Sequence, residues 1–83
     1  MPSKSMTAEA RQRLGELQDD VKTLLARHLN VKAQINNQER EISYAAKASD
    51  KWKIHKEIRI LYCMARILVR RISGLRASRG NQQ

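Results

Sequence analysis

Six residues in the second half of the chain follow one another at steps of three or four, the spacing of one side of an α-helix. They are Lys56, Arg59, Cys63, Arg66, Arg70 and Ser73. Four of the six are cationic and none is acidic, so a helix here would carry a positive line about 25 Å long at 1.5 Å per residue. Such a line, with Lys53 at its flank, can bind an anion, although a charged helix side can also be ordinary solvated surface. We call these six residues the basic stripe.

No residue pattern predicts catalysis. The one cysteine, Cys63, has no histidine or carboxylate spaced to activate it. A single cysteine also excludes an intramolecular disulfide and leaves no plausible zinc site. Paired carboxylates such as Asp19 with Asp20 fall on the polar side of the first helix described below. We therefore expect a protein that is not an enzyme and that uses no cofactor, metal ion or small-molecule substrate.

The formal net charge of +9 is concentrated in one part of the chain. Residues 1–50 hold eight basic and seven acidic side chains, whereas residues 51–83 hold nine basic side chains and one acidic side chain, Glu57. Clustered Lys and Arg gain most where they displace counterions from a polyanion, either a nucleic acid or an anionic membrane surface. The membrane is the less favoured partner, because the arginines of the basic stripe would interrupt the apolar surface of a membrane-bound helix.

The start of the chain carries no recognisable targeting signal, since residues 1–5 contain no apolar core. No apolar run approaches the roughly 18–20 residues that cross a bilayer. We expect a cytoplasmic protein, and the single cysteine fits a reducing compartment.

A long amphipathic helix is predicted over residues 7–47, after a flexible N-terminus at residues 1–6. Its apolar stripe repeats in heptads and includes two polar residues, His28 and Gln38, which we interpret as register-setting. The stripe consists of Leu14, Leu17, Val21, Leu24, His28, Val31, Ile35, Gln38, Ile42 and Ala45.

A second helix is predicted over residues 51–76, because the apolar repeat restarts there with its register shifted by two residues. The new stripe consists of Ile54, Ile58, Leu61, Ala65, Leu68, Ile72 and Leu75. Ser49 and Asp50 can cap this helix, which predicts a turn at residues 48–50 and an antiparallel helical hairpin. Trp52 is expected to pack against the open end of the hairpin, with base stacking as the alternative. Residues 77–83 are predicted to form a basic, disordered tail.

The second helix is apolar on more than one side. Ile60, Met64 and Ile67 form a second apolar face, and Tyr62 and Val69 lie on a third. One partner helix cannot cover all of these side chains, so the helix is expected at the centre of a bundle. The sequence therefore predicts an all-α homodimer in which two hairpins form a four-helix bundle.

The predicted anionic partner is a nucleic-acid duplex. Proteins hold single strands largely by stacking bases on aromatic rings, and the basic stripe contains none. Double-stranded RNA is recognised by shape, through phosphate and 2′-hydroxyl contacts that a flat helical face can make without reading sequence. Duplex DNA stays open as an alternative, although the chain has neither helix-turn-helix spacing nor a zinc finger.

The chain resembles the small RNA-silencing suppressors of insect nodaviruses. The resemblance rests on the opening Met1-Pro2-Ser3-Lys4, the plan of two long helices, and the run Leu61-Tyr62-Cys63-Met64-Ala65-Arg66. It implies a dimeric four-helix bundle that lies along double-stranded RNA in the host cytoplasm and shields it from Dicer and from silencing complexes. Cys63 and Arg66 match two RNA-facing residues of the family. The family's further arginine falls on Ser73 here, so Arg70 would substitute one turn earlier.

A different class of function is also open. The chain could be a coiled-coil adaptor or chaperone whose apolar second helix binds a protein partner, with the basic charge secondary.

Overall fold

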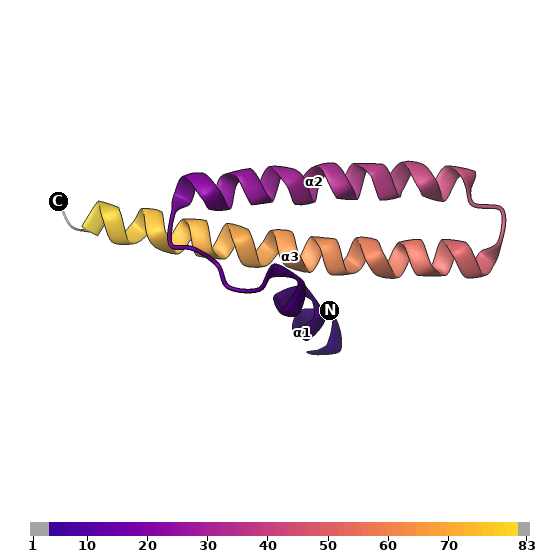
Figure 1. Ribbon diagram of the computed structural model, residues 1–83, viewed down its shortest axis with the longest axis horizontal. Helices are drawn as coiled ribbons and strands as arrows, with labels where there is room; N and C mark the ends of the chain where they lie inside the picture. Colours follow the sequence, from indigo (N-terminus) through magenta and orange to yellow (C-terminus); the bar gives the residue numbers. More distant parts are fainter. Residues whose placement is uncertain (1–3, 82–83) are drawn as a thin grey trace.

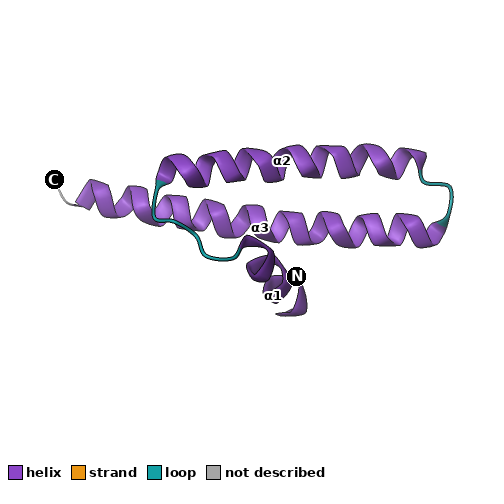
Figure 2. Ribbon diagram, in the orientation of Figure 1, coloured by secondary structure: helices purple, strands orange, loops and turns teal. Residues whose placement is uncertain are grey.

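The computed structural model describes residues 4–81, which form three helices and no strand. These are α1 (Lys4–Leu14), α2 (Val21–Tyr44) and α3 (Ala48–Asn81). Helices α2 and α3 lie antiparallel and side by side, while α1 lies against α3 and is inclined to the hairpin (Figure 1). Within residues 4–81, loops occur only between α1 and α2 and between α2 and α3 (Figure 2). The predicted all-α class and antiparallel hairpin are confirmed.

The hairpin turn lies a little earlier than predicted. Helix α2 ends where Ala45 adopts extended backbone angles (φ −73°, ψ 121°) and its N–H bonds back to the carbonyls of Glu41 and Ile42. Residues 45–47 make the connection, and α3 has already begun at Ala48. Asp50 therefore lies in the first turn of α3, where its carboxylate is favourable against the helix dipole, rather than in a turn at residues 48–50.

The prediction of one helix over residues 7–47 is wrong. Gly15 has φ +64°, a left-handed conformation that costs glycine little, and its N–H donates to the Arg11 carbonyl at 3.0 Å. This geometry ends α1, and the chain stays non-helical over residues 15–20. Asp20 then starts α2, because its carboxylate accepts hydrogen bonds from the Lys22 backbone N–H and the Thr23 hydroxyl.

Helix α1 covers the second apolar face of α3. Ala10 and Leu14 of α1 are buried in one cluster with Ile60 and Met64 of α3, whose exposed fractions are only 4% and 7%. Met6 and Ile67 pack against the same cluster. The sequence predicted that a second copy of the chain covers this face. That prediction is wrong, because the chain's own N-terminal helix buries these side chains.

The seam between α2 and α3 follows the predicted apolar stripes. Leu24, Leu61 and Leu68 are its most deeply buried side chains. The buried residues at the seam are Leu24, Val31, Ile35, Leu61, Leu68 and Ile72. His28 and Gln38 share the α2 stripe by spacing and are half-buried.

Both ends of the chain are more helical than expected. Residues 4–6 belong to α1, although a flexible segment was predicted over residues 1–6. At the other end α3 continues through residues 77–81 of the predicted disordered tail, because Gly74 keeps a negative φ and does not end the helix. The remaining residues of both predicted segments, 1–3 and 82–83, lie outside the described part of the chain.

We expect Leu68→Ala to lower the free energy of unfolding by about 2–5 kcal/mol, through lost burial and the cavity left behind. Tyr44→Ala is the control, because Tyr44 is 86% exposed and its truncation removes little packing. Urea unfolding followed by circular dichroism measures both variants. Equal losses of stability would contradict this packing of α2 on α3.

Candidate nucleic-acid interface

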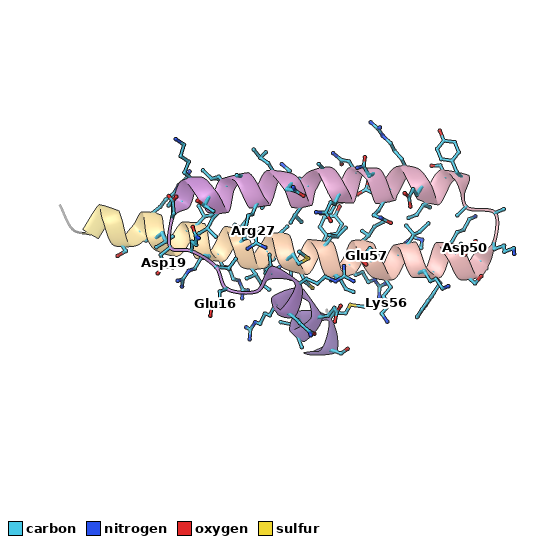
Figure 3. The ribbon with its side chains drawn as sticks, viewed as in Figure 1. Glu16, Asp19, Arg27, Asp50, Lys56 and Glu57 are labelled. Atoms are coloured by element: carbon cyan, nitrogen blue, oxygen red, sulfur yellow. The ribbon has the colours of Figure 1, made fainter. Side chains whose placement is uncertain are left out.

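The basic stripe lies on the side of α3 that faces away from α2. At 3.6 residues per turn, Arg59, Arg66 and Arg70 lie roughly half a turn around the helix from Leu61 and Leu68, which pack on α2. In Figure 3 the Lys56 side chain likewise extends from α3 on the side away from α2.

The predicted site residues are solvent-accessible. Cys63 is half-buried and packs against the apolar core. The exposed members are Lys53, Lys56, Arg59, Arg66, Arg70 and Ser73. Lys53 lies off the stripe by its helical spacing, and it shares with Lys56 a groove between α1 and α3. All six stripe residues belong to α3, so this helix alone aligns them, and α1 packs beside the stripe.

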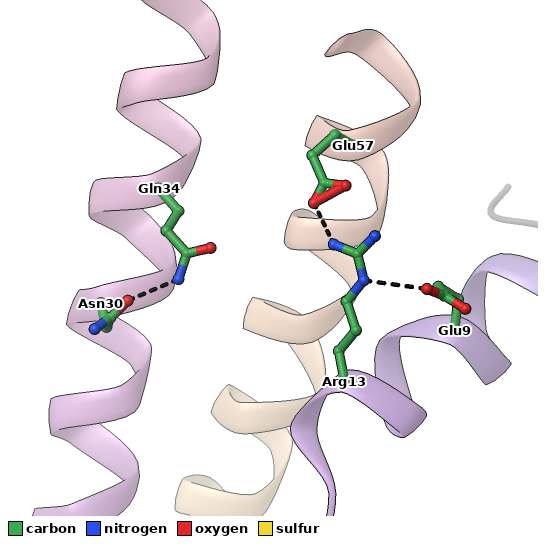
Figure 4. Close-up of polar contacts among 5 residues, drawn as sticks. All are labelled: Glu9, Arg13, Asn30, Gln34 and Glu57. Carbon is green, nitrogen blue, oxygen red and sulfur yellow. Dashed lines mark hydrogen bonds and ion pairs between the residues drawn. The ribbon is translucent and has the colours of Figure 1, made fainter. Parts of the chain in front are cut away.

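Two acidic side chains on or beside α3, Glu57 and Asp19, are paired with arginines. Glu57, the one acid after residue 50, forms an ion pair with Arg13 of α1, whose Nε also donates to Glu9 at 3.2 Å (Figure 4). The hydrogen bond to Glu57 raises the pKa of Arg13. Asp19, in the loop before α2, pairs with Arg71 of α3.

The stripe arginines are left without such partners. Within residues 4–81, no ion pair forms at Arg59, Arg66 or Arg70. The three guanidinium groups are therefore exposed, uncompensated cations on one long helix. This arrangement is suited to phosphate, which guanidinium groups bind through paired N–H donors.

Trp52 is not where the sequence predicted. It was expected to pack against the open end of the hairpin, but its side chain is 64% exposed, and the Lys56 Nζ lies 5.5 Å from the centre of its ring. Trp52 precedes Lys56 by four residues and so lies one turn beyond the end of the basic stripe. That spacing was visible in the sequence and could have placed the residue.

Helix α1 adds a basic residue that sequence reasoning missed. Arg11 is exposed and lines a groove together with Arg70 and Ile67 of α3. Arg11 and Arg70 come together because α1 folds back on α3. The prediction of a single helix over residues 7–47 could not indicate this contact.

The two flanks of α2 differ in what they pack against. Arg13 and Met64 line a groove with Arg27, Asn30 and Gln34, which marks the flank of α2 nearest α1. On the other flank of α2, Glu39 accepts a 3.1 Å hydrogen bond from the Tyr62 hydroxyl, and this bond raises the pKa of Tyr62.

Helical spacing places four exposed apolar residues on the Tyr62 side. These are Leu25, Leu29, Tyr62 and Val69. We call this surface the open apolar face, and it lies away from α1.

In the part of the chain that the structure describes, no group of His, Cys, Asp or Glu side chains is arranged to hold a metal ion. None of the helices in residues 4–81 is both long and apolar enough to span a bilayer.

No protein-family model, curated protein or solved structure matches the chain.

Proposed function

We propose that the protein binds double-stranded RNA through the basic stripe of α3, without reading its sequence. The observation that carries this proposal is the row of exposed arginines, Arg59, Arg66 and Arg70, which have no ion-pair partner within residues 4–81. As the resemblance to nodavirus silencing suppressors implies, binding would shield the RNA from Dicer and from loading into silencing complexes.

Phosphate groups are the expected contacts of the basic stripe. Each Lys or Arg that neutralises a phosphate releases condensed counterions, which supplies most of the affinity when no base is read. Residues on a continuous helix keep a fixed spacing, so they suit the regular backbone of a duplex better than a flexible single strand. The wide, shallow minor groove of A-form RNA exposes phosphates and 2′-hydroxyls to such a surface.

We further propose that the protein acts as a homodimer joined through its open apolar face. Helix α1 already covers Ile60 and Met64, so this face is the apolar surface left for a second copy. Two hairpins packed there would form a four-helix bundle from both copies of α2 and α3, with each α1 outside. If the two α3 helices lie side by side, their stripes would form one longer basic surface.

The same apolar face supports the second candidate function. Exposed apolar patches mark sites of protein contact, and Leu29 and Val69 are 67% and 46% exposed. A protein partner docked there would make the chain an adaptor or chaperone. The two functions differ in whether an RNA duplex binds.

Binding to an RNA duplex of roughly 20 base pairs, longer than the about 16 that a double-stranded RNA-binding domain spans, is expected to fall steeply between about 50 and about 200 mM salt. Arg70→Ala should weaken binding and reduce the slope of the logarithmic salt plot by about 0.9, the value for one phosphate contact on B-form DNA. Gel-shift titration of a duplex in several sequences measures both effects.

Arg71→Ala is the matched control for this titration. It removes the same charge from the neighbouring position, but Arg71 is paired with Asp19 and lies off the stripe. Equal weakening by the two variants would refute the stripe as the binding surface. No binding of any duplex at low salt would favour the adaptor.

Leu29→Asp should convert a dimer to a monomer without unfolding it, because an unpaired carboxylate would be buried only in the assembled interface. Sedimentation equilibrium gives the mass, and circular dichroism gives the helix content. Ala26→Asp, also exposed on α2 but in the groove on the flank nearest α1, should leave the dimer intact. The proposed interface would be wrong if the wild-type protein is monomeric at all concentrations, or if Leu29→Asp leaves the dimer intact.

A further inference from the structure

A groove of about 570 Å³ lies between α1 and the first turns of α3. Its volume falls in the range of about 300–1,000 Å³ that is usual for small-ligand sites. Met6 of α1 and Ile60 of α3 give it an apolar lining, and Trp52 forms part of its wall. The groove is therefore large enough for a flat organic ring, and its lining is partly apolar.

Packing within the protomer does not explain why the Trp52 ring is exposed in this groove. Its ring is 64% exposed, and the ammonium of Lys56 lies 5.5 Å from the ring centre. A large exposed aromatic ring gains free energy by stacking on another ring, and a nucleic-acid base supplies one.

The lysine side chains around the Trp52 ring favour the binding of an anion. Lys53 and Lys56 line the groove beside Trp52, and no ion pair forms at either lysine within residues 4–81. The two acids of the groove, Glu9 and Glu57, are both bound to Arg13 (Figure 4). The groove thus combines an aromatic ring with two unpaired ammonium groups, which matches the base and phosphate of a nucleotide.

The position of the groove indicates which nucleotide this would be. Trp52 precedes Lys56 by one turn on the same side of α3 and stands next to the connection at residues 45–47, so it lies at one end of the basic stripe. A duplex held along the stripe keeps its internal bases paired and stacked on each other. Only a base at or beyond its end is free to stack on Trp52.

We infer that this groove binds an unpaired nucleotide extending from the end of an RNA duplex, with its base on Trp52 and its phosphate at Lys53 and Lys56. The inference rests on the proposed function, because the duplex itself is held by the basic stripe. It adds a preference for overhanging ends to binding that is otherwise independent of sequence.

The test compares one RNA duplex of roughly 20 base pairs in two forms, blunt and with a short unpaired 3′ overhang. Trp52 is the single tryptophan of the chain, so its fluorescence reports on this groove alone. We expect the overhang to quench this fluorescence and to tighten binding roughly tenfold, within the range measured for stacking one base on an aromatic side chain. The blunt duplex should bind without comparable quenching.

Trp52→Ala should abolish the advantage of the overhang while leaving affinity for the blunt duplex within about twofold, and Trp52→Phe should restore part of it. Tyr44→Ala is the matched control, because Tyr44 is an exposed aromatic residue at the same end of the hairpin but outside the groove. Equal affinity for both forms, equal quenching by both, or an overhang effect that survives in Trp52→Ala would overturn the inference while binding of the blunt duplex stands. If neither form binds, the proposed function fails with it.

Discussion

Helix α3 has apolar side chains on more sides than one neighbouring helix can cover, and the arrangement of the whole chain follows from this constraint. Helix α2 buries the side that carries Leu61 and Leu68. Leaving Ile60 and Met64 in water would cost roughly 1.5–3 kcal/mol for each side chain, a large share of the stability of a small domain. Helix α1 folds back to cover them.

This packing also determines where charge is left uncompensated. The return of α1 brings Arg13 to Glu57, and the loop that follows brings Asp19 to Arg71. Both pairs are partly exposed, so each stabilises the fold by at most about 1 kcal/mol. They occupy Glu57 and Asp19. In residues 4–81 no acid pairs with Arg59, Arg66 or Arg70, and these three arginines are available to an external anion.

The sequence predicted the seam between α2 and α3 well, because the heptad repeat of apolar residues indicates which side chains are buried. It could not place the break at Gly15, since Leu14, Leu17 and Val21 keep the same spacing across it. Glycine inside a helix costs only about 1 kcal/mol, so the choice between a break and a straight helix depends on burying Ile60 and Met64. That gain is tertiary and leaves no local signal. Trp52, by contrast, could have been placed from the sequence, because it lies four residues before Lys56 and so on the same exposed side of α3.

The central claim is that the stripe side of α3, left open by α1 and α2, is the surface that meets RNA. NMR spectra of the arginine Nε–Hε groups during titration with a blunt RNA duplex test this claim most directly. Signals of Arg59, Arg66 and Arg70 should shift together at low salt, while Arg40 on α2 and the paired Arg13 stay in place. Shifts centred on Arg40, or spread evenly over all arginines, would contradict the account.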